Sequence, residues 1–250
     1  MSGHSKWANI KHKKENADKK RGVVFTRLAR AITVAAREGG SDPNANFTLR
    51  LALDKARAAN MPKDNIERSI QRGAGGDKGV QLERVVYEGY GPQGSAVMVA
   101  ATTDNRNRTV GEIRFVFNKY GGSLGEGGSV AWQFEQRGVI NVPAEELDPD
   151  ELVLTAIDAG ALDVEVDDGL VTVYTATTDF RKVKDKLAEA GVNTDDAELA
   201  MIPTNRIALE DKATVQILRF ADALEDLDDV DQVWTNVEIS DSAAELFAEG

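Results

Sequence analysis

The chain has 250 residues, 42% of them apolar, with no cysteine, two histidines and a net charge of −12. It has no run of eighteen apolar residues and no apolar segment after its basic start, which excludes an ordinary membrane-spanning helix and a secretory signal and predicts a cytoplasmic protein. Because cysteine is absent and both histidines, His4 and His12, lie at the very start, we expect no Cys/His or Ser/His/Asp site and predict that the protein is not an enzyme.

The negative net charge conceals a division along the chain. Residues 1–73 hold sixteen Lys and Arg against seven Asp and Glu, whereas the remaining residues hold fourteen against thirty-five. A basic part at one end of an acidic protein is typical of a module that meets a polyanion. Nucleic acid is therefore the expected partner, and the acidic part is expected to provide solubility and to limit wrong contacts.

A dense group of cations opens the chain, with a tryptophan among them. Basic groups that contact phosphates, beside an aromatic ring on which a base stacks, are typical of a nucleic-acid-binding segment. The alternative is a solvated arm that only keeps the protein soluble. This alternative is weaker because the rest of the protein is acidic and therefore already soluble. The candidate residues of this segment are Lys6, Trp7, Lys11, His12, Lys13, Lys14, Lys19, Lys20 and Arg21.

Three amphipathic helices are expected next, over 17–38, 44–59 and 62–73. In each of them apolar residues recur at spacings of three and four, and Gly39-Gly40 and Gly73 are stop signals. Three short helices of this kind pack as a small bundle. Arginines that project away from the buried stripes are expected to face a partner, and the candidates for nucleic-acid contact among them are Arg27, Arg30, Arg50 and Arg57.

The glycine-rich residues 72–79, RGAGGDKG, show no periodicity and are expected to form a hinge between this bundle and the rest of the chain. The pattern then changes to strands over 85–90 and 96–102, which flank a Gly-Pro-Gln-Gly turn and so predict a hairpin. A helix over 109–120 and a strand over 130–134 are expected to follow.

The stretch TTDNRNRT, residues 102–109, joins a strand to a helix and carries two arginines. Asn105 suits a helix cap, and Arg106 and Arg108 lie where the free amides of a helix start favour anions. Two arginines at this end of a helix invite an anion such as phosphate. The alternative is pairing with nearby carboxylates, for example Asp104 or Glu112.

From Gly138 the order of elements is strand, helix, strand, strand, helix, strand, over 139–142, 150–159, 163–166, 170–174, 180–190 and 198–202. This βαββαβ order is that of a ferredoxin-like unit. A short strand from Ile207, a helix over 213–227 and a strand over 232–239 complete the pattern.

These elements predict an α+β protein with a three-helix bundle followed by two α+β domains, one of them inserted in the other. The expected domains are a basic helical bundle at 1–76, an α+β domain made of 80–135 and 204–241, and an inserted ferredoxin-like domain at 136–203. Contiguous domains are the alternative.

We expect neither a cofactor nor a metal site. The glycines of RGAGGDKG and GGSLGEGGSV match neither GxGxxG nor the phosphate loop. For YEGYGPQG and GGSLGEGGSV we predict ordinary hairpin and bend chemistry, and the alternative is a contribution to polyanion binding. The acidic run EDLDDVD, residues 225–231, is a candidate carboxylate site by count alone, but it lacks the ligand spacing of a calcium loop. We interpret the run as a solvated loop.

Five stretches together resemble signatures of the YebC/PmpR family: SGHSKWANIKHKK, NMPKDNIERSIQRG, YEGYGP, TDNRNRT and GGSLGEGGSV. The similarity extends over nearly the whole chain and is densest from Ser2 to Val130. It implies an N-terminal helical bundle followed by two α+β domains, one inserted in the other. At matching motif positions it implies nucleic-acid contact by Lys6, Trp7, Lys11, Lys13, Lys14, Asn105, Arg106 and Arg108.

The resemblance also implies a role in gene expression. Members of the family are commonly described as probable transcriptional regulators that bind DNA, and some repress quorum-sensing genes. Related proteins, among them mitochondrial translational activators of cytochrome c oxidase, look like translation factors that relieve ribosome stalling, notably at proline runs. One position departs from the family pattern: Phe47, near the start of the second helix, stands where a small or polar residue or proline is expected.

We therefore expect a cytoplasmic, cofactor-free nucleic-acid-binding regulator, whose tail and bundle contact phosphates of DNA or of ribosomal or transfer RNA. A DNA-binding transcriptional regulator is the first hypothesis. A ribosome-associated translation factor is the alternative, since no helix shows a convincing row of base-reading residues. A protein-interaction module is a further alternative. We expect no membrane and no small-molecule substrate, and a monomer is compatible with a sequence that leaves the oligomeric state open.

Overall fold

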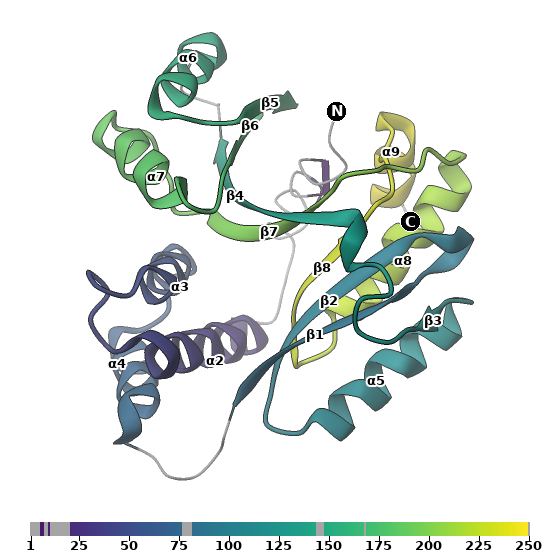
Figure 1. Ribbon diagram of the computed structural model, residues 1–250, viewed down its shortest axis with the longest axis horizontal. Helices are drawn as coiled ribbons and strands as arrows, with labels where there is room; N and C mark the ends of the chain where they lie inside the picture. Colours follow the sequence, from purple (N-terminus) through teal and green to yellow (C-terminus); the bar gives the residue numbers. More distant parts are fainter. Residues whose placement is uncertain are drawn as a thin grey trace.

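The computed structural model describes residues 6–7, 10, 21–76, 82–143, 148–167 and 169–249. Helices at the N-terminal side are followed by two four-stranded antiparallel sheets with further helices, so the expected α+β class is confirmed (Figure 1). We call the two sheets with their helices, residues 82–249, the body. No helix in the described ranges is both long enough and apolar enough to cross a membrane.

The N-terminal helices form a small bundle with its own apolar core. The elements are α2 (Arg21–Gly39), α3 (Phe47–Ala58), α4 (Lys63–Gln71) and the short η1 (Arg72–Gly76). The core side chains are Ile32, Ala35, Leu49, Leu53, Ala56 and Ile66. Gly73 packs closely on α2, because a Cβ at this position would collide with the carbonyl of Thr33. Residues 72–76 of the expected hinge form the short η1, in which Gly75 has a φ of 99°, outside the helical region, and residues 77–81 lie outside the described ranges.

The start of α3 is set by Asn46. Its side-chain oxygen accepts the N–H of Leu49 at 3.0 Å, and its amide donates to the carbonyls of Ala35 and Gly40 at 2.7 and 2.8 Å. An asparagine in this position both caps its own helix and holds the end of the preceding one. The helix therefore begins at Phe47 and not at 44, where the sequence pattern placed it.

The first sheet has the strand order β3-β1-β2-β8. Its members are β1 (Glu83–Tyr90), β2 (Ala96–Thr103), β3 (Ser123–Leu124) and β8 (Val230–Thr235). The expected hairpin of β1 and β2, joined by the turn η2 (Pro92–Gly94), is confirmed. β8 comes from near the other end of the chain and pairs antiparallel with β2. The C-terminal elements thus share a sheet with the hairpin, while the exact domain limits stay a prediction.

Helices cover one face of this sheet. They are α5 (Arg106–Lys119), α8 (Asp211–Glu225) and, packed beside α8, α9 (Asp241–Ala248). Val97 and Val99 of β2 point toward α5 and α8, where the rings of Phe117 and Phe220 meet edge to face with 4.9 Å between centroids. The alternate residues of β2 point to the opposite face and meet a separate apolar cluster that includes Phe134.

The second sheet has the order β5-β6-β4-β7, with every neighbouring pair antiparallel. Its elements are β4 (Phe134–Pro143), α6 (Pro149–Ala159), β5 (Asp163–Asp167), β6 (Leu170–Thr175), α7 (Phe180–Glu189) and β7 (Ala197–Pro203). The two helices pack on one face of the sheet around Ile140, Val173 and Phe180. Chain order and strand order are those of a ferredoxin-like unit, as expected from the sequence.

The bundle also packs against this ferredoxin-like unit, through α3 and α7. Phe47 contacts Phe180 edge to face, with 5.4 Å between ring centroids. Beside them, the largely buried ammonium of Lys184 donates to Asp54 at 2.9 Å, and Arg50 pairs with Asp185 at 2.6 Å. The departure from the family pattern at Phe47 is thus an apolar contact between bundle and body.

Several expected elements need correction. The strand over 130–134 is wrong: η3 (Ala131–Gln133) forms there, because the carboxylate of Glu88 accepts the N–H groups of Val130 and Ala131 and turns the chain. The helix expected from 109 begins at Arg106, and the strand expected over 232–239 is β8, which ends at Thr235. The strand expected from 207 is a single bridge between Ile207 and Val237. β3 and α9 were not expected.

Gly138 allows the closest contact between sheet and helix in the ferredoxin-like unit. A Cβ at this position would collide with the ring of Phe180 and the hydroxyl of Thr175. We expect Gly138→Ala to lower the free energy of unfolding by about 1–3 kcal/mol, because the overpacked core must shift. The measurement is a urea melt of each variant. As a control, Gly111→Ala in α5, where a Cβ meets open space, should raise stability by roughly 0.5–1 kcal/mol.

Candidate nucleic-acid interface

Two candidate residues of the tail, Lys6 and Trp7, lie against the C-terminal helices of the body. The ammonium of Lys6 is buried and pairs with Asp241 at the start of α9. Trp7 packs beside Phe247, with 5.9 Å between ring centroids, and its indole N–H donates to a carboxylate oxygen of Glu225 at 3.3 Å. These contacts attach the start of the chain to the body.

The other basic residues of the tail fall outside the described ranges. They are Lys11, His12, Lys13, Lys14, Lys19 and Lys20. Arg21 is described only as the first backbone position of α2. Contact between these residues and phosphates stays a prediction.

Arg27 and Arg30 project away from the bundle core, as expected, but they reach the end of α8. Arg27 Nη2 donates to the carbonyls of Glu225 and Leu227 at 2.6 and 3.1 Å, and Arg30 Nη1 donates to that of Asp228 at 3.0 Å. The last carbonyls of a helix have no partner inside it and form the negative end of its dipole. The expectation that these arginines stay open to an external partner is therefore corrected, because the last residue of α8 and the turn that follows it occupy them.

The carboxylate of Asp229, directly after these carbonyls, joins three elements. Its side chain is 2% exposed and accepts from Arg30 at 2.7 Å and from Arg108 at 2.5 Å. It also accepts from the hydroxyls of Thr103 at 3.1 Å and Thr109 at 2.8 Å. The bundle, β2 and α5 therefore meet at one acid. The interpretation of residues 225–231 as a solvated loop is wrong at this position, because the arginines of two helices enclose it.

The surroundings of Asp229 keep it charged. Burial alone raises the pKa of this carboxyl, but the hydrogen bonds from Arg108 and Thr109 and the nearby charge of Arg30 outweigh burial and hold the pKa below its usual value. A charged acid between two cations leaves little positive charge at this place for an external anion.

The TTDNRNRT stretch folds as a capped helix start. Asn105 is confirmed as the cap of α5, because its side-chain oxygen accepts the N–H of Arg108 at 3.1 Å. Arg108 pairs with Asp104 at 2.9 Å as well as with Asp229, and Arg106 pairs with Glu83 at 2.6 Å. The alternative of pairing with carboxylates is thus confirmed, with Glu83 in the place of Glu112. The guanidinium groups of Arg106 and Arg108 remain partly exposed next to the buried Asp229, but both are paired with carboxylates and are not free cations.

The remaining candidate arginines differ in their exposure. Arg50 is held by Asp185, as described above, and a third of its side chain is exposed. Arg57 pairs with Asp54 at 3.3 Å and keeps 65% of its side chain exposed. Arg57 therefore remains accessible to a partner on the outer face of the bundle, whereas Arg50 serves the contact with the body.

The loop GGSLGEGGSV is organised by one acid of the hairpin. Glu88 accepts the N–H groups of Gly128, Val130 and Ala131 at 2.8–2.9 Å. Burial by itself raises the pKa of Glu88, and the three backbone donors reverse this and hold it below its usual value. This agrees with the expectation of bend chemistry for the loop. Among the described residues, no group of three or more His, Cys, Asp or Glu is placed to hold a metal ion.

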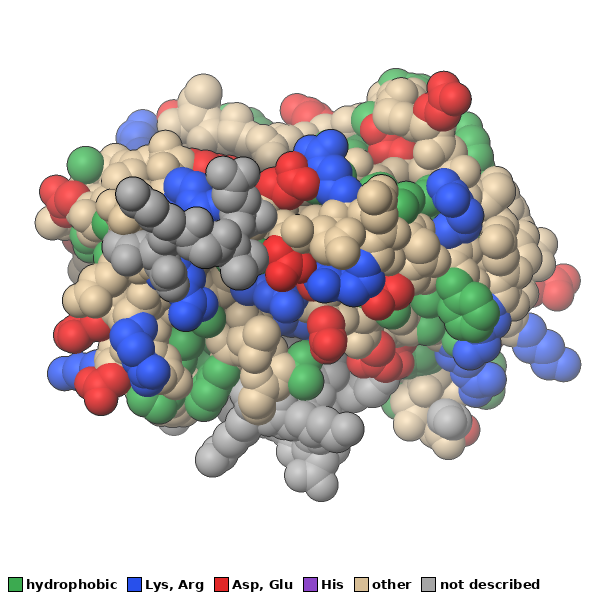
Figure 2. All heavy atoms as spheres, turned by 90° about the horizontal axis from the view of Figure 1, so that it is seen from below, with side chains coloured by type: hydrophobic (Ala, Val, Ile, Leu, Met, Phe, Trp, Pro, Cys, Tyr) green, Lys and Arg blue, Asp and Glu red, His purple; other side chains and the backbone are tan. Residues whose placement is uncertain are grey.

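Two cations that the sequence did not single out lie on the exposed side of the bundle. Arg68 of α4 and Arg72 of η1 are both exposed and lie four residues apart, so they share one side of the helix. That spacing was the signal that could have identified them. Figure 2 shows Lys and Arg side chains interleaved with Asp and Glu side chains over this side of the molecule, instead of one continuous basic patch.

Comparison with known proteins supports a single family for both parts of the chain. Residues 5–76 match the family model described as the TACO1/YebC protein N-terminal domain, and residues 82–237 match that described as the TACO1/YebC second and third domain. The chain belongs to the TACO1/YebC family. The resemblance noted in the sequence is therefore confirmed.

Relatives of similar length are found in several organisms. A probable transcriptional regulatory protein of Halothermothrix orenii is 51% identical over 252 residues, with all of both chains covered. One of Herpetosiphon aurantiacus is 53% identical, covering 100% of this chain and 99% of the relative. The crystal structure of a conserved hypothetical protein, Aq1575, of Aquifex aeolicus has a TM-score of 0.85 at 45% identity, covering 90% of this chain and 93% of that one. Family membership and fold thus agree.

The arrangement around Asp229 generates a test of how the bundle is attached. Asp229→Asn should lower the free energy of unfolding by about 2–4 kcal/mol, because Arg30 and the buried hydroxyls lose a charged acceptor. It should also speed amide hydrogen exchange in α2, measured by mass spectrometry. Asp228→Asn is the matched control: that side chain is exposed and only its backbone carbonyl is used, so it should behave as wild type. Equal behaviour of the two variants would contradict the role assigned to Asp229.

The depressed pKa values of Asp229 and Glu88 generate a pH dependence. In the unfolded chain these groups bind protons near their ordinary pKa values of 3.8 and 4.5, whereas the folded protein binds them only at lower pH. Their contribution to stability is therefore complete above these values and is lost as the pH falls through the folded pKa values. Urea melts from pH 7 to pH 3 should show a constant free energy of unfolding down to about pH 5 and a decline below it. Asp229→Asn should make the decline shallower.

Proposed function

We propose that this protein is a cytoplasmic, non-enzymatic regulator of gene expression that binds nucleic acid through its N-terminal basic part. The charge division carries the proposal: residues 1–73 hold sixteen Lys and Arg against seven Asp and Glu, on a chain whose net charge is −12. The names of its relatives, probable transcriptional regulatory proteins, support transcription as the regulated process and DNA as the partner.

The contacts of the bundle narrow down which cations do the binding. Arg27, Arg30 and Arg50 have partners within the body, so the proposal places phosphate contacts on residues outside these pairings. These are the tail residues from Lys11 to Arg21, together with the exposed Arg57 on the bundle. Asn105, Arg106 and Arg108 lie at the border and are proposed to orient the nucleic acid without carrying most of the binding energy.

A ribosome-associated translation factor is the second candidate. It is favoured by the lack of a row of base-reading Asn, Gln or Arg on the described α3 and α4, where exposed basic residues are mixed with acidic ones on α4. Binding through phosphates alone suits RNA that is recognised by shape. The experiment that decides between the two is sedimentation of the protein from lysate at low and high salt, with sequencing of crosslinked nucleic acid. Ribosomal or transfer RNA supports a translation factor, and discrete promoter DNA supports a transcriptional regulator.

The tail lysines provide the direct test of binding. Replacing Lys11, Lys13 and Lys14 with alanine should weaken binding to nucleic acid and reduce the slope of log K against log salt by about 2 for a single strand, because three phosphate contacts are lost. Binding is measured by fluorescence anisotropy at several salt concentrations, and the melting temperature should not change.

The control for this variant removes the same charge elsewhere. Lys182, Lys212 and Arg219 are exposed on α7 and α8, and their joint replacement with alanine should leave the salt slope as in wild type. If wild-type protein binds neither DNA nor RNA, or if both variants lose binding equally, the tail does not hold a polyanion.

A further inference from the structure

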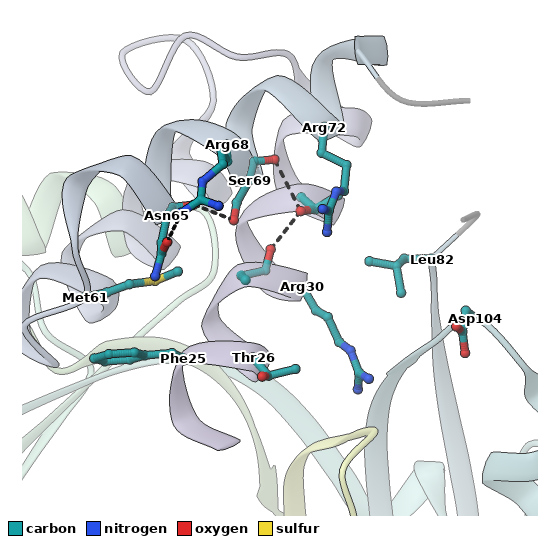
Figure 3. Close-up of a pocket in the computed structure, with 12 residues that line it drawn as sticks. Phe25, Thr26, Arg30, Met61, Asn65, Arg68, Ser69, Arg72, Leu82 and Asp104 are labelled. Atoms are coloured by element: carbon teal, nitrogen blue, oxygen red, sulfur yellow. Dashed lines mark hydrogen bonds between the residues drawn. The ribbon is translucent and has the colours of Figure 1, made fainter. Parts of the chain in front are cut away.

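A cleft of about 550 Å³ lies between the bundle and the start of the first sheet (Figure 3). One side is formed by α2 and α4, and Leu82 and Asp104 lie on the other. Its volume falls within the range of about 300–1,000 Å³ that is usual for sites that hold a small organic ligand. It is far too small for a duplex, whose major groove alone is about 12 Å wide.

The cleft is lined by three arginines and one acid. Arg30, Arg68 and Arg72 come from the bundle, and the acid, Asp104, is already paired with Arg108 at 2.9 Å. Figure 3 shows Arg30 and Arg72 reaching from the bundle toward the side on which Leu82 and Asp104 lie. An excess of guanidinium groups over carboxylates at a concave surface favours a phosphate.

Contacts within the chain hold two of these guanidinium groups in place while leaving donors unused. Arg30 uses Nη1 for the carbonyl of Asp228 and the carboxylate of Asp229. Arg68 uses Nε for the carbonyl of Asp64 at 3.1 Å and Nη2 for the side chain of Asn65. In the part of the chain that the structure describes, the other N–H groups of both arginines have no partner. A phosphate at Arg68 would therefore meet donors that are already oriented, at little cost in side-chain entropy, while Arg30 stays bound to Asp228 and Asp229.

The end of the cleft opposite Leu82 is apolar. Figure 3 shows Phe25 and Met61 side by side there, below Asn65. Phe25 is half-buried, so part of its ring is left uncovered next to the cleft, while Met61 is almost fully buried and forms its floor. An aromatic ring and a thioether next to an amide are a suitable surface for a nucleobase, which stacks on one and hydrogen-bonds to the other.

We propose that this cleft binds one unpaired nucleotide of a single-stranded nucleic acid, with its phosphate at Arg68 and Arg72 and its base against Phe25 and Met61. This inference rests on the proposed function and adds to it a defined binding site. The tail and the cleft then have different roles. The tail increases the affinity for nucleic acid through its charge, and the cleft makes binding selective for a strand that is not base-paired.

The test replaces Arg68 and Arg72 with alanine in the full chain. Arg68 is exposed and contacts only its own helix, so Arg68→Ala alone, made beside the double variant, should keep the wild-type melting temperature and still weaken the binding of single strands. Binding is measured by fluorescence anisotropy with a labelled RNA and DNA of about twelve nucleotides, each single-stranded and as a duplex. For the single strands we expect roughly tenfold weaker binding and a salt slope smaller by about 0.7, because the contact to one phosphate is lost. Duplex binding should change much less.

The matched control is Lys212→Ala with Arg219→Ala, which removes the same charge from α8, and it should bind all four probes as wild type does. If the cleft variant binds single strands normally while the variant at Lys11, Lys13 and Lys14 has lost binding, the cleft inference is refuted and the proposed function stands. If wild-type protein binds none of the probes, the proposed function itself is refuted.

A second measurement does not depend on any variant. A single strand with one photoreactive base should crosslink to the peptides that contain Phe25 and Met61, located by mass spectrometry. Crosslinks confined to other parts of the chain would overturn the assignment. A mononucleotide, AMP, serves as the last probe. The proposal of a strand is refuted if AMP raises the melting temperature of the wild-type protein but not of the Arg68 and Arg72 variant, while both proteins bind single strands equally well. The ligand of the cleft is then a free nucleotide.

Discussion

A single buried carboxylate determines how the parts of this protein are joined. Asp229 is tolerated in the interior only because Arg30, Arg108 and two hydroxyls surround it, and these partners come from the bundle, α5 and β2. The arginines of α2 also donate to the carbonyl of Glu225 at the end of α8 and to those of Leu227 and Asp228 in the turn that follows, so the same side chains complete a helix end and attach a domain. The bundle is attached a second time through α3 and α7, and these two attachments together fix the cleft between α4 and the first sheet.

Because the body binds several arginines of the bundle, not all of the positive charge of the bundle is available to an external partner. A count of charges along the chain identifies an excess but does not say which cations are already paired, because pairing depends on residues far away in sequence. Arg27 and Arg30 look like an open basic face on an isolated helix, and in the folded protein they end in the C-terminal part of the body. Among the described residues of the bundle, positive charge that the body does not hold therefore lies at its edge, as at Arg57, and not over its whole surface.

Much of the fold was predictable because its signals are local. Periodicity and stop signals identified the helices of the bundle and the βαββαβ order, and the strand pairing of β2 with β8 agrees with an inserted unit. The errors arose where a single side chain controls distant backbone: Asn46 moves the start of α3, and Glu88 converts an apparent strand into a turn. For the site, the sequence indicated the basic tail and the capped helix start at Asn105. It could not indicate that Asp229 is buried, since an acidic run looks the same whether it meets water or arginines.

The position of β8 and its neighbours has a consequence for how the protein is made. Three contacts between distant parts of the chain each have one partner near the C-terminal end. β8 pairs with β2, Asp229 binds the bundle and α5, and Asp241 binds Lys6. Chains emerge from the ribosome N-terminus first, and contacts between distant segments form slowly. The ferredoxin-like unit has all its strands in one continuous segment and can fold early. The bundle is synthesised first and can pack on α7 once that helix has been made, but its second attachment, at Asp229, forms only after the last part of the chain has been made.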